Sequence, residues 1–185
     1  MAILSFRREL PWGEPANFVA KIRAGVKIHT FRFGDAWYPG RLIDFYDQNP
    51  RNGGQAFDLG DFDKALDWKT IERSGGRKLN LPVCSAVESW EMAFAFRLDH
   101  DDNETLEVGS WEFVIGDLAV DENVLEVVAA ADGFDSTDAF VRYFAGESKR
   151  KGTDTISGQI IHWTDKVYDL ASAKTIKHDY FKPRR

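Results

Sequence analysis

The stretch that decides the fold is residues 25–32, which read Gly25-Val26-Lys27-Ile28-His29-Thr30-Phe31-Arg32. Before it, Phe18 and Ile22 lie at helical spacing within residues 15–24, and glycine is the residue most often found just after a helix end. Residues 28–33 are rich in β-branched and aromatic side chains, which are typical of strands. The stretch therefore predicts a helix that stops at Gly25, with a strand directly after it.

The segments that follow predict further strands and helices. After the turn at Pro39-Gly40, residues 42–46 indicate a second strand, which we expect in the same sheet as residues 28–33. Alternation over residues 92–98 with a return at 105–115 indicates a hairpin. Asp121 is a helix cap for a helix that ends before Gly133.

A second helix is expected to start at Asp135 or Ser136. A charged loop is expected at residues 149–154, and a last strand at 156–163. Separate strand pairs with helices between them predict an α+β fold built on a mixed β-barrel with flanking helices, rather than a doubly wound parallel sheet.

Composition sets limits on the class of protein. The chain has 185 residues, a single cysteine and a net charge of −6, which favour one domain over residues 1–185 without a disulfide or a multi-cysteine zinc site. We expect no metal and no cofactor. No segment reaches the ~20 apolar residues of a membrane helix, and nothing at the N-terminus resembles a signal peptide, so the cytoplasm is the expected compartment.

Two parts of the chain lie outside the predicted barrel. Residues 47–81 contain several Gly and Pro residues and aromatics without periodicity, so we interpret them as a long insertion with a short helix near 62–72. Residues 165–185 are interpreted as a C-terminal extension.

The pattern Gly-x-Lys-x-x-Thr-x-Arg, with a helix stop before it and a glycine turn and strand after it, resembles the opening of ASCH domains in the PUA-like superfamily. Residues 132–136 with the apolar helix after them, and residues 158–164 as a closing strand, resemble later parts of the same family. The resemblance covers residues 3–46 and 121–163. It implies a PUA-like barrel, a fold used for RNA and modified-base recognition.

Some bacterial ASCH proteins are amidohydrolases that deacetylate N(4)-acetylcytidine through a lysine, a threonine and a glutamate acting together. By the motif, Lys27 and Thr30 fall on the first two positions, and Asp132 falls near the third as the shorter acid. In this chemistry a lysine of lowered pKa activates the threonine hydroxyl, and the acid protonates the leaving amine. In a regular strand Lys27 and Thr30 point to opposite faces, so they converge only if Lys27 lies in the turn after Gly25.

Several neighbours are candidates for contact with a ligand. Arg32 shares a strand face with Thr30 and is able to hold a phosphate or a base carbonyl. Trp37 and Tyr38 are candidates for stacking on a base, and Gly25 opens the motif. His29 alternates away from Thr30, so we expect it to pack on the other face.

These observations leave three functions open. The first is a module that binds a nucleobase, nucleoside, nucleotide or RNA segment beside the motif. The second is an amidohydrolase acting on an acylated nucleoside, and the third is a protein-interaction adaptor that works through residues 47–81. The net charge of −6 disfavours a wide phosphate-binding surface. We favour binding, because Asp132 stands where the resembling enzymes have glutamate.

Overall fold

The computed structural model describes residues 2–57, 68–73, 77–98, 106–164, 166–169 and 174–177. The strands in chain order are β1 Ala2–Ser5, β2 His29–Phe33, β3 Ile43–Tyr46, β4 Trp68–Arg73, β5 Arg77–Pro82, β6 Ala86–Leu98, β7 Leu106–Ile115, β8 Leu118–Ala119, β9 Thr155–His162, β10 Lys166–Asp169 and β11 Lys174–Lys177. The helices are α1 Phe18–Arg23, the 3₁₀ turn η1 Pro50–Asn52, α2 Glu122–Ala131 and α3 Thr137–Lys151.

The main sheet of the described residues is antiparallel, in the order β2-β9-β6-β7-β8. β9 lies between β2 and β6, so that His29 and Ala86 both pair with His162. The β6–β7 hairpin, both helices after it and the strand expected at 156–163 are confirmed. Asp121 and Ser136 accept hydrogen bonds from the first turns of α2 and α3, as helix caps do.

The fold is α+β, and the described ladders form no closed barrel. The expectation that residues 28–33 and 42–46 share one sheet is wrong, because β3 pairs in parallel with β1 in a separate sheet. The two sheets approach each other where a single bridge joins Leu42 to Val83. The chain then enters β6, and the N–H of Ser85 donates to the carbonyl of His162. Residues 82–86 thus pass from one sheet to the other.

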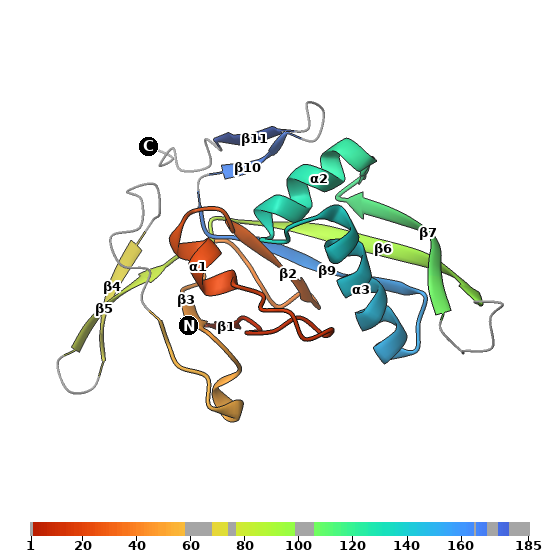
Figure 1. The fold of residues 1–185 in the computed structure, drawn as a ribbon. Helices are drawn as coiled ribbons and strands as arrows, with labels where there is room; N and C mark the ends of the chain where they lie inside the picture. The colour runs from red at the N-terminus through yellow and green to blue at the C-terminus, as the bar shows by residue number, and fades with distance from the viewer. Residues whose placement is uncertain are drawn as a thin grey trace.

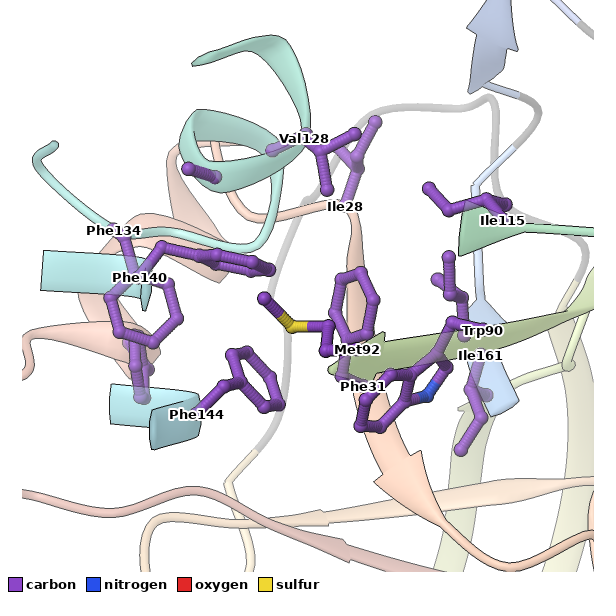
Figure 2. Close-up of a cluster of buried hydrophobic side chains, with 14 of the residues drawn as sticks. Ile28, Phe31, Trp90, Met92, Ile115, Val128, Phe134, Phe140, Phe144 and Ile161 are labelled. Atoms are coloured by element: carbon purple, nitrogen blue, oxygen red, sulfur yellow. The ribbon is translucent and has the colours of Figure 1, made fainter. Parts of the chain in front are cut away.

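The main sheet buries apolar side chains on the face beneath α2 and α3. Figure 2 shows Phe31, Trp90 and Met92 of the sheet pointing toward Phe140 and Phe144 of α3. The ring centroids of Phe31 lie 5.4 Å from those of both Phe140 and Phe144. These edge-to-face contacts fix the helices on this face of the sheet.

A second aromatic group lies by β1 and β3. The Phe6 ring stacks on Phe45 at 5.6 Å, and Trp163 meets Phe45 edge-on at 5.2 Å. Within the described residues, the indole N–H of buried Trp163 has no hydrogen-bond partner. Phe57, just before the undescribed residues 58–67, packs against the same rings.

Two local predictions are wrong. Residues 68–73 form β4 rather than part of a helix, and β4 pairs with β5 in its own ladder; residues 62–67 lie outside the described part. Figure 1 shows this hairpin projecting away from the main sheet. Residues 149–151 belong to α3 rather than to a loop, because the helix continues until Gly152, which has φ 68°.

The other boundaries concern the ends of the chain. β10 and β11 pair with each other within the proposed extension at 165–185, whose remaining residues lie outside the described part. That extension, like the insertion at 47–81, stays a prediction. None of the helices in the described ranges combines the length and apolarity that crossing a bilayer requires.

Candidate functional site

Lys27 lies in the turn between α1 and β2, as the convergence of the motif requires. The N–H groups of Val26 and Lys27 both donate to the carbonyl of Lys21, at 2.9 and 3.1 Å. Gly25, with φ 70°, supplies the left-handed residue that ends α1. β2 begins only at His29, so the alternation of the strand does not govern Lys27.

Asp132 meets Lys27 at the end of α2. The Lys27 Nζ donates to Oδ1 of Asp132 at 2.6 Å and also to the Asp132 carbonyl. Lys27 is 1% exposed and Asp132 is 4% exposed, so this is a buried ion pair. The sequence prediction that these two residues come together is therefore matched by the geometry.

The backbone explains why Asp132 reaches this place. The carbonyl of Ala131 accepts the N–H of Ile28 at 2.9 Å, and the Asp132 carboxylate accepts the N–H of Phe31. The end of α2 therefore accepts hydrogen bonds from N–H groups on the edge of β2 that faces away from β9. Gly133 allows the chain to turn here, because glycine adopts a φ of 85° without strain. Glycine also leaves room for Lys27, since an added Cβ would lie 3.1 Å from its Cδ.

Both charges of the pair have perturbed pKa values. Burial lowers the pKa of Lys27 to about 8, and the charge and hydrogen bond of Asp132 oppose that shift. Burial likewise raises the pKa of Asp132, against the positive charges of Lys27 and Arg32. These are the directions that a proton acceptor and a proton donor need at neutral pH.

Arg32 approaches the pair from β2 along the Phe6 ring. Its guanidinium carbon lies 5.5 Å from the Phe6 centroid, and the Lys27 Nζ lies 5.7 Å from the same centroid. Arg32 donates to the carbonyl of Ser5 at 2.6 Å. The Phe6 ring thus contacts two cations, those of Lys27 and Arg32. The sequence does not indicate this contact, because Phe6 follows β1, and β1 is positioned by a non-local pairing with β3.

Thr30 shares the Arg32 face of β2, as predicted. It is 3% exposed and pairs with Ile161 across the sheet. The described hydrogen bonds of the Lys27 Nζ go to Asp132 rather than to Thr30. Two residues of the proposed trio, Lys27 and Asp132, are therefore in contact, while Thr30 is buried on β2 beside them.

Trp37 and Tyr38 lie on the loop after β2, and Gln159 connects this loop to Arg32. Gln159 is the cross-strand partner of Arg32, and its side chain bonds both the N–H and the carbonyl of Trp37, at 2.9 and 3.2 Å. The guanidinium of Arg41 lies 4.9 Å from the Trp37 ring and 5.6 Å from the Tyr38 ring. Tyr38 is 60% exposed, so one aromatic face is open to solvent.

The sequence reasoning missed Phe6, Gln159 and Arg41 as neighbours of the motif. Only Arg41 had a local signal, since it follows the Pro39-Gly40 turn. His29 packs on the opposite face, as expected: it is buried and stacks on His162 at 5.3 Å. Among the described residues, no group of three or more His, Cys, Asp or Glu side chains is placed to hold a metal.

The sequence also predicts that Lys27, Thr30, Arg32 and Asp132 border one concave pocket, and this stays a prediction. Lys27, Thr30 and Asp132 are buried and Arg32 is half-buried. A groove of about 1530 Å³ lies elsewhere, between α2, α3 and β7, and none of the four lines it.

Comparisons with protein-family models, with curated proteins and with solved structures find no match for this chain.

Proposed function

We propose that the protein binds a nucleobase-containing ligand, a nucleotide or a short single-stranded RNA segment, beside the Lys27 turn. The observation that carries the proposal is the buried Lys27–Asp132 pair with Arg32 on the shared Phe6 ring. Buried charges cost several kcal/mol of desolvation, and clusters of perturbed titratable groups occur preferentially at functional sites. The motif that supplies Lys27 and Arg32 is the one that resembles ASCH domains.

The chemistry of these side chains suits the edge of a base. A carboxylate accepts hydrogen bonds from ring or exocyclic N–H groups, while lysine and arginine donate to carbonyl oxygens and phosphates. The indole N–H of Trp163, which has no partner among the described residues, is a further donor near Phe6. The open Tyr38 face beside Arg41 would supply stacking, which tolerates any base.

The binding test uses exposed or half-buried residues whose loss spares the fold. Nucleosides, nucleotides and short RNA oligomers are screened by thermal shift, since a ligand at 100 times its Kd stabilises by ~2.7 kcal/mol. Arg32→Gln and Tyr38→Ala should each weaken binding of the selected ligand by about tenfold, given charge-assisted hydrogen bonds and base stacking of ~1–3 kcal/mol. Arg51→Gln, an exposed arginine on η1, is the matched control and should bind normally.

Absence of any shift across the panel would sink the proposal. Equal loss in Arg32→Gln and Arg51→Gln would reduce it to general attraction between charges.

Hydrolysis of an acylated nucleoside is the second candidate, and the lowered pKa of Lys27, about 8, is the observation that favours it. It would require Thr30 to lose its proton to Lys27 after a ligand displaces Asp132 from the lysine. The parent protein is incubated with N(4)-acetylcytidine, and free cytidine is measured by chromatography. If the protein is an enzyme, Thr30→Ala should abolish release while nucleoside binding persists; an inert parent that still binds would leave binding as the function.

A further inference from the structure

The groove between α2, α3 and β7 is independent of the site around Lys27. Its volume of about 1530 Å³ exceeds the roughly 300–1,000 Å³ that small-ligand pockets occupy, which suits a length of polypeptide. Its helical walls include small residues, among them Ala130 and Gly146, while Trp12 and Trp111 supply aromatic area. An added Cβ at Gly146 would meet nothing within 4 Å, so space lies directly above α3.

The backbone of β7 borders this groove. Four consecutive residues, 108–111, line it; because strand side chains alternate between faces, a consecutive run means that the strand edge itself faces the space. β8 pairs only with Val114 and Ile115, and the N–H of Val120 bonds the Phe113 carbonyl. Pairing alternates along an antiparallel strand, so Trp111, two residues earlier, presents its N–H and carbonyl to the same outer edge.

That edge has no strand partner among the described residues. The sheet order ends with the short β8, which leaves β7 open on its outer side before Phe113. A register shift opposite Gly109, between Ala95 and Phe96, bends the strand here. Unpaired edges of this kind accept an added strand from a partner, which binds through main-chain hydrogen bonds.

The charges around the groove indicate what that strand carries. Glu122, Glu126 and Asp138 are exposed along it, and no ion pair joins any of the three to another described residue. Asp135 is paired with Lys21 at 2.7 Å. On the basic side, Arg142 lies over the Trp12 ring at 4.5 Å and Lys149 lies over the Phe96 ring at 5.0 Å. The groove is therefore complementary to a basic segment.

We propose that this groove binds an extended, lysine- or arginine-rich peptide segment of a partner protein. The segment adds to the outer edge of β7 at Trp111 and directs its basic side chains toward Glu126 on α2 and Asp138 on α3. This interaction surface uses none of the residues of the nucleobase site. It is therefore tested separately from the function proposed above.

The probe is a pool of fluorescein-labelled peptides of about eight residues, the length of an ordinary strand, with lysine at every second position and varied apolar residues between. Binding is followed by fluorescence anisotropy. Gly146→Trp fills the groove and should weaken binding by at least about tenfold, because a large side chain occupies the open space above α3. Gly146→Ala is the matched control, since it changes the same helical position but leaves the space open, and it should bind as the parent does.

Two further measurements separate strand addition from simple charge attraction. The pair Glu126→Gln and Asp138→Asn should weaken the basic pool about tenfold, and a pool with glutamate in place of lysine should not bind. On saturation, the amide of Trp111 should become protected from hydrogen exchange, as a newly paired strand edge requires. The proposal would be overturned if the basic pool did not bind, or if Gly146→Trp and Gly146→Ala bound it equally. It would also be overturned by a concentration-dependent dimer that only Gly146→Trp disrupts, because the groove would then bind a second copy of the chain.

Discussion

At the scale of single residues, the Lys27–Asp132 pair dominates the chemistry of this protein. Each partner is nearly inaccessible, and the positive charge lies 4.7 Å from the Phe18 ring. A buried ion pair adds little to the free energy of unfolding compared with a well-packed apolar pair. Removing one partner, however, leaves the other charge buried without compensation. We therefore connect the pair with the binding function proposed above rather than with stability alone.

A double-mutant cycle measures this interdependence. Lys27→Met should lower the free energy of unfolding by about 3–5 kcal/mol, because the Asp132 charge is left unpaired. The double variant Lys27→Met/Asp132→Asn should recover about 1–3 kcal/mol of that loss, since the amide oxygen still accepts the Phe31 N–H. Urea denaturation gives both values. Asp132→Asn alone completes the cycle. If the losses of Lys27→Met and Asp132→Asn add up to the loss of the double variant, the two residues are not coupled.

The same pair predicts how stability changes with pH. The folded pKa of Lys27 is about 8 against the ordinary 10.5, so between these values the unfolded chain holds more protons and stability rises with pH. Asp132 acts oppositely at acid pH: burial raises its pKa above 3.8, and its contribution is present below 3.8 and lost as pH rises through the folded value.

Urea midpoints measured from pH 7 to 11 check the alkaline limb, with the double variant as the reference that lacks both groups. The native chain should gain stability relative to that reference between pH 8 and 10.5, the two pKa values of Lys27. A difference that stays flat over this range would contradict the lowered pKa.

At the scale of elements, the end of α2 holds the site together. Ala131 and Asp132 bond the start of β2, and Gly133 turns the chain toward α3. Burial of Phe134 against Phe18, with centroids 5.6 Å apart, then attaches this turn to α1. The end of α2 is thereby joined to α1 and β2, which lie far earlier in the chain, around the side chain of Lys27.

Two glycine substitutions isolate this packing. Gly133 and Gly152 both follow helices at positive φ, 85° and 68°, so alanine at either should cost about 1–2 kcal/mol of conformational strain. An alanine Cβ at Gly133 would also crowd Lys27, whereas at Gly152 it meets nothing within 4 Å. Thermal unfolding should therefore show Gly133→Ala as the more destabilising change; equal losses would mean that the Lys27 stem moves aside freely.

The elements also show how far the sequence alone can be read. α2, α3 and the β6–β7 hairpin follow from local periodicity and caps, and the motif led to the contact between Lys27 and Asp132. β1 was missed because four residues give little periodic signal and its partner β3 lies far along the chain. The glycine-rich surroundings of residues 68–73 obscure the strand there, and the charged run at 149–151 obscures the continuation of α3 to its stop at Gly152. Phe6 and Gln159 reach the site only through tertiary packing.

At the scale of the whole molecule, stability should be uneven. β6 and β9 lie in the interior of the main sheet, with α2 and α3 over one face. The β4–β5 hairpin forms its own two-stranded ladder, and Figure 1 shows it away from that core. A two-stranded hairpin is at best marginally stable alone.

Hydrogen exchange followed by mass spectrometry tests this contrast. Peptides from β4 and β5 should exchange through local opening, with free energies well below that of global unfolding, while peptides from 86–95 and from β9 should exchange only through global unfolding. Equal protection in both regions would show that the hairpin belongs to the same cooperative unit as the main sheet.

The position of β9 between β2 and β6 also affects how the chain folds during its synthesis on the ribosome. His29 pairs with His162, and at ~5–20 residues per second the ribosome needs on the order of ten seconds to make the chain between them. Throughout that interval the apolar side chains of β2 lack their neighbouring strand, and long-range pairing of this kind closes slowly. A nascent chain paused before β9 therefore holds β2 without its cross-strand partner, although the residues that contact Lys27 have already been made.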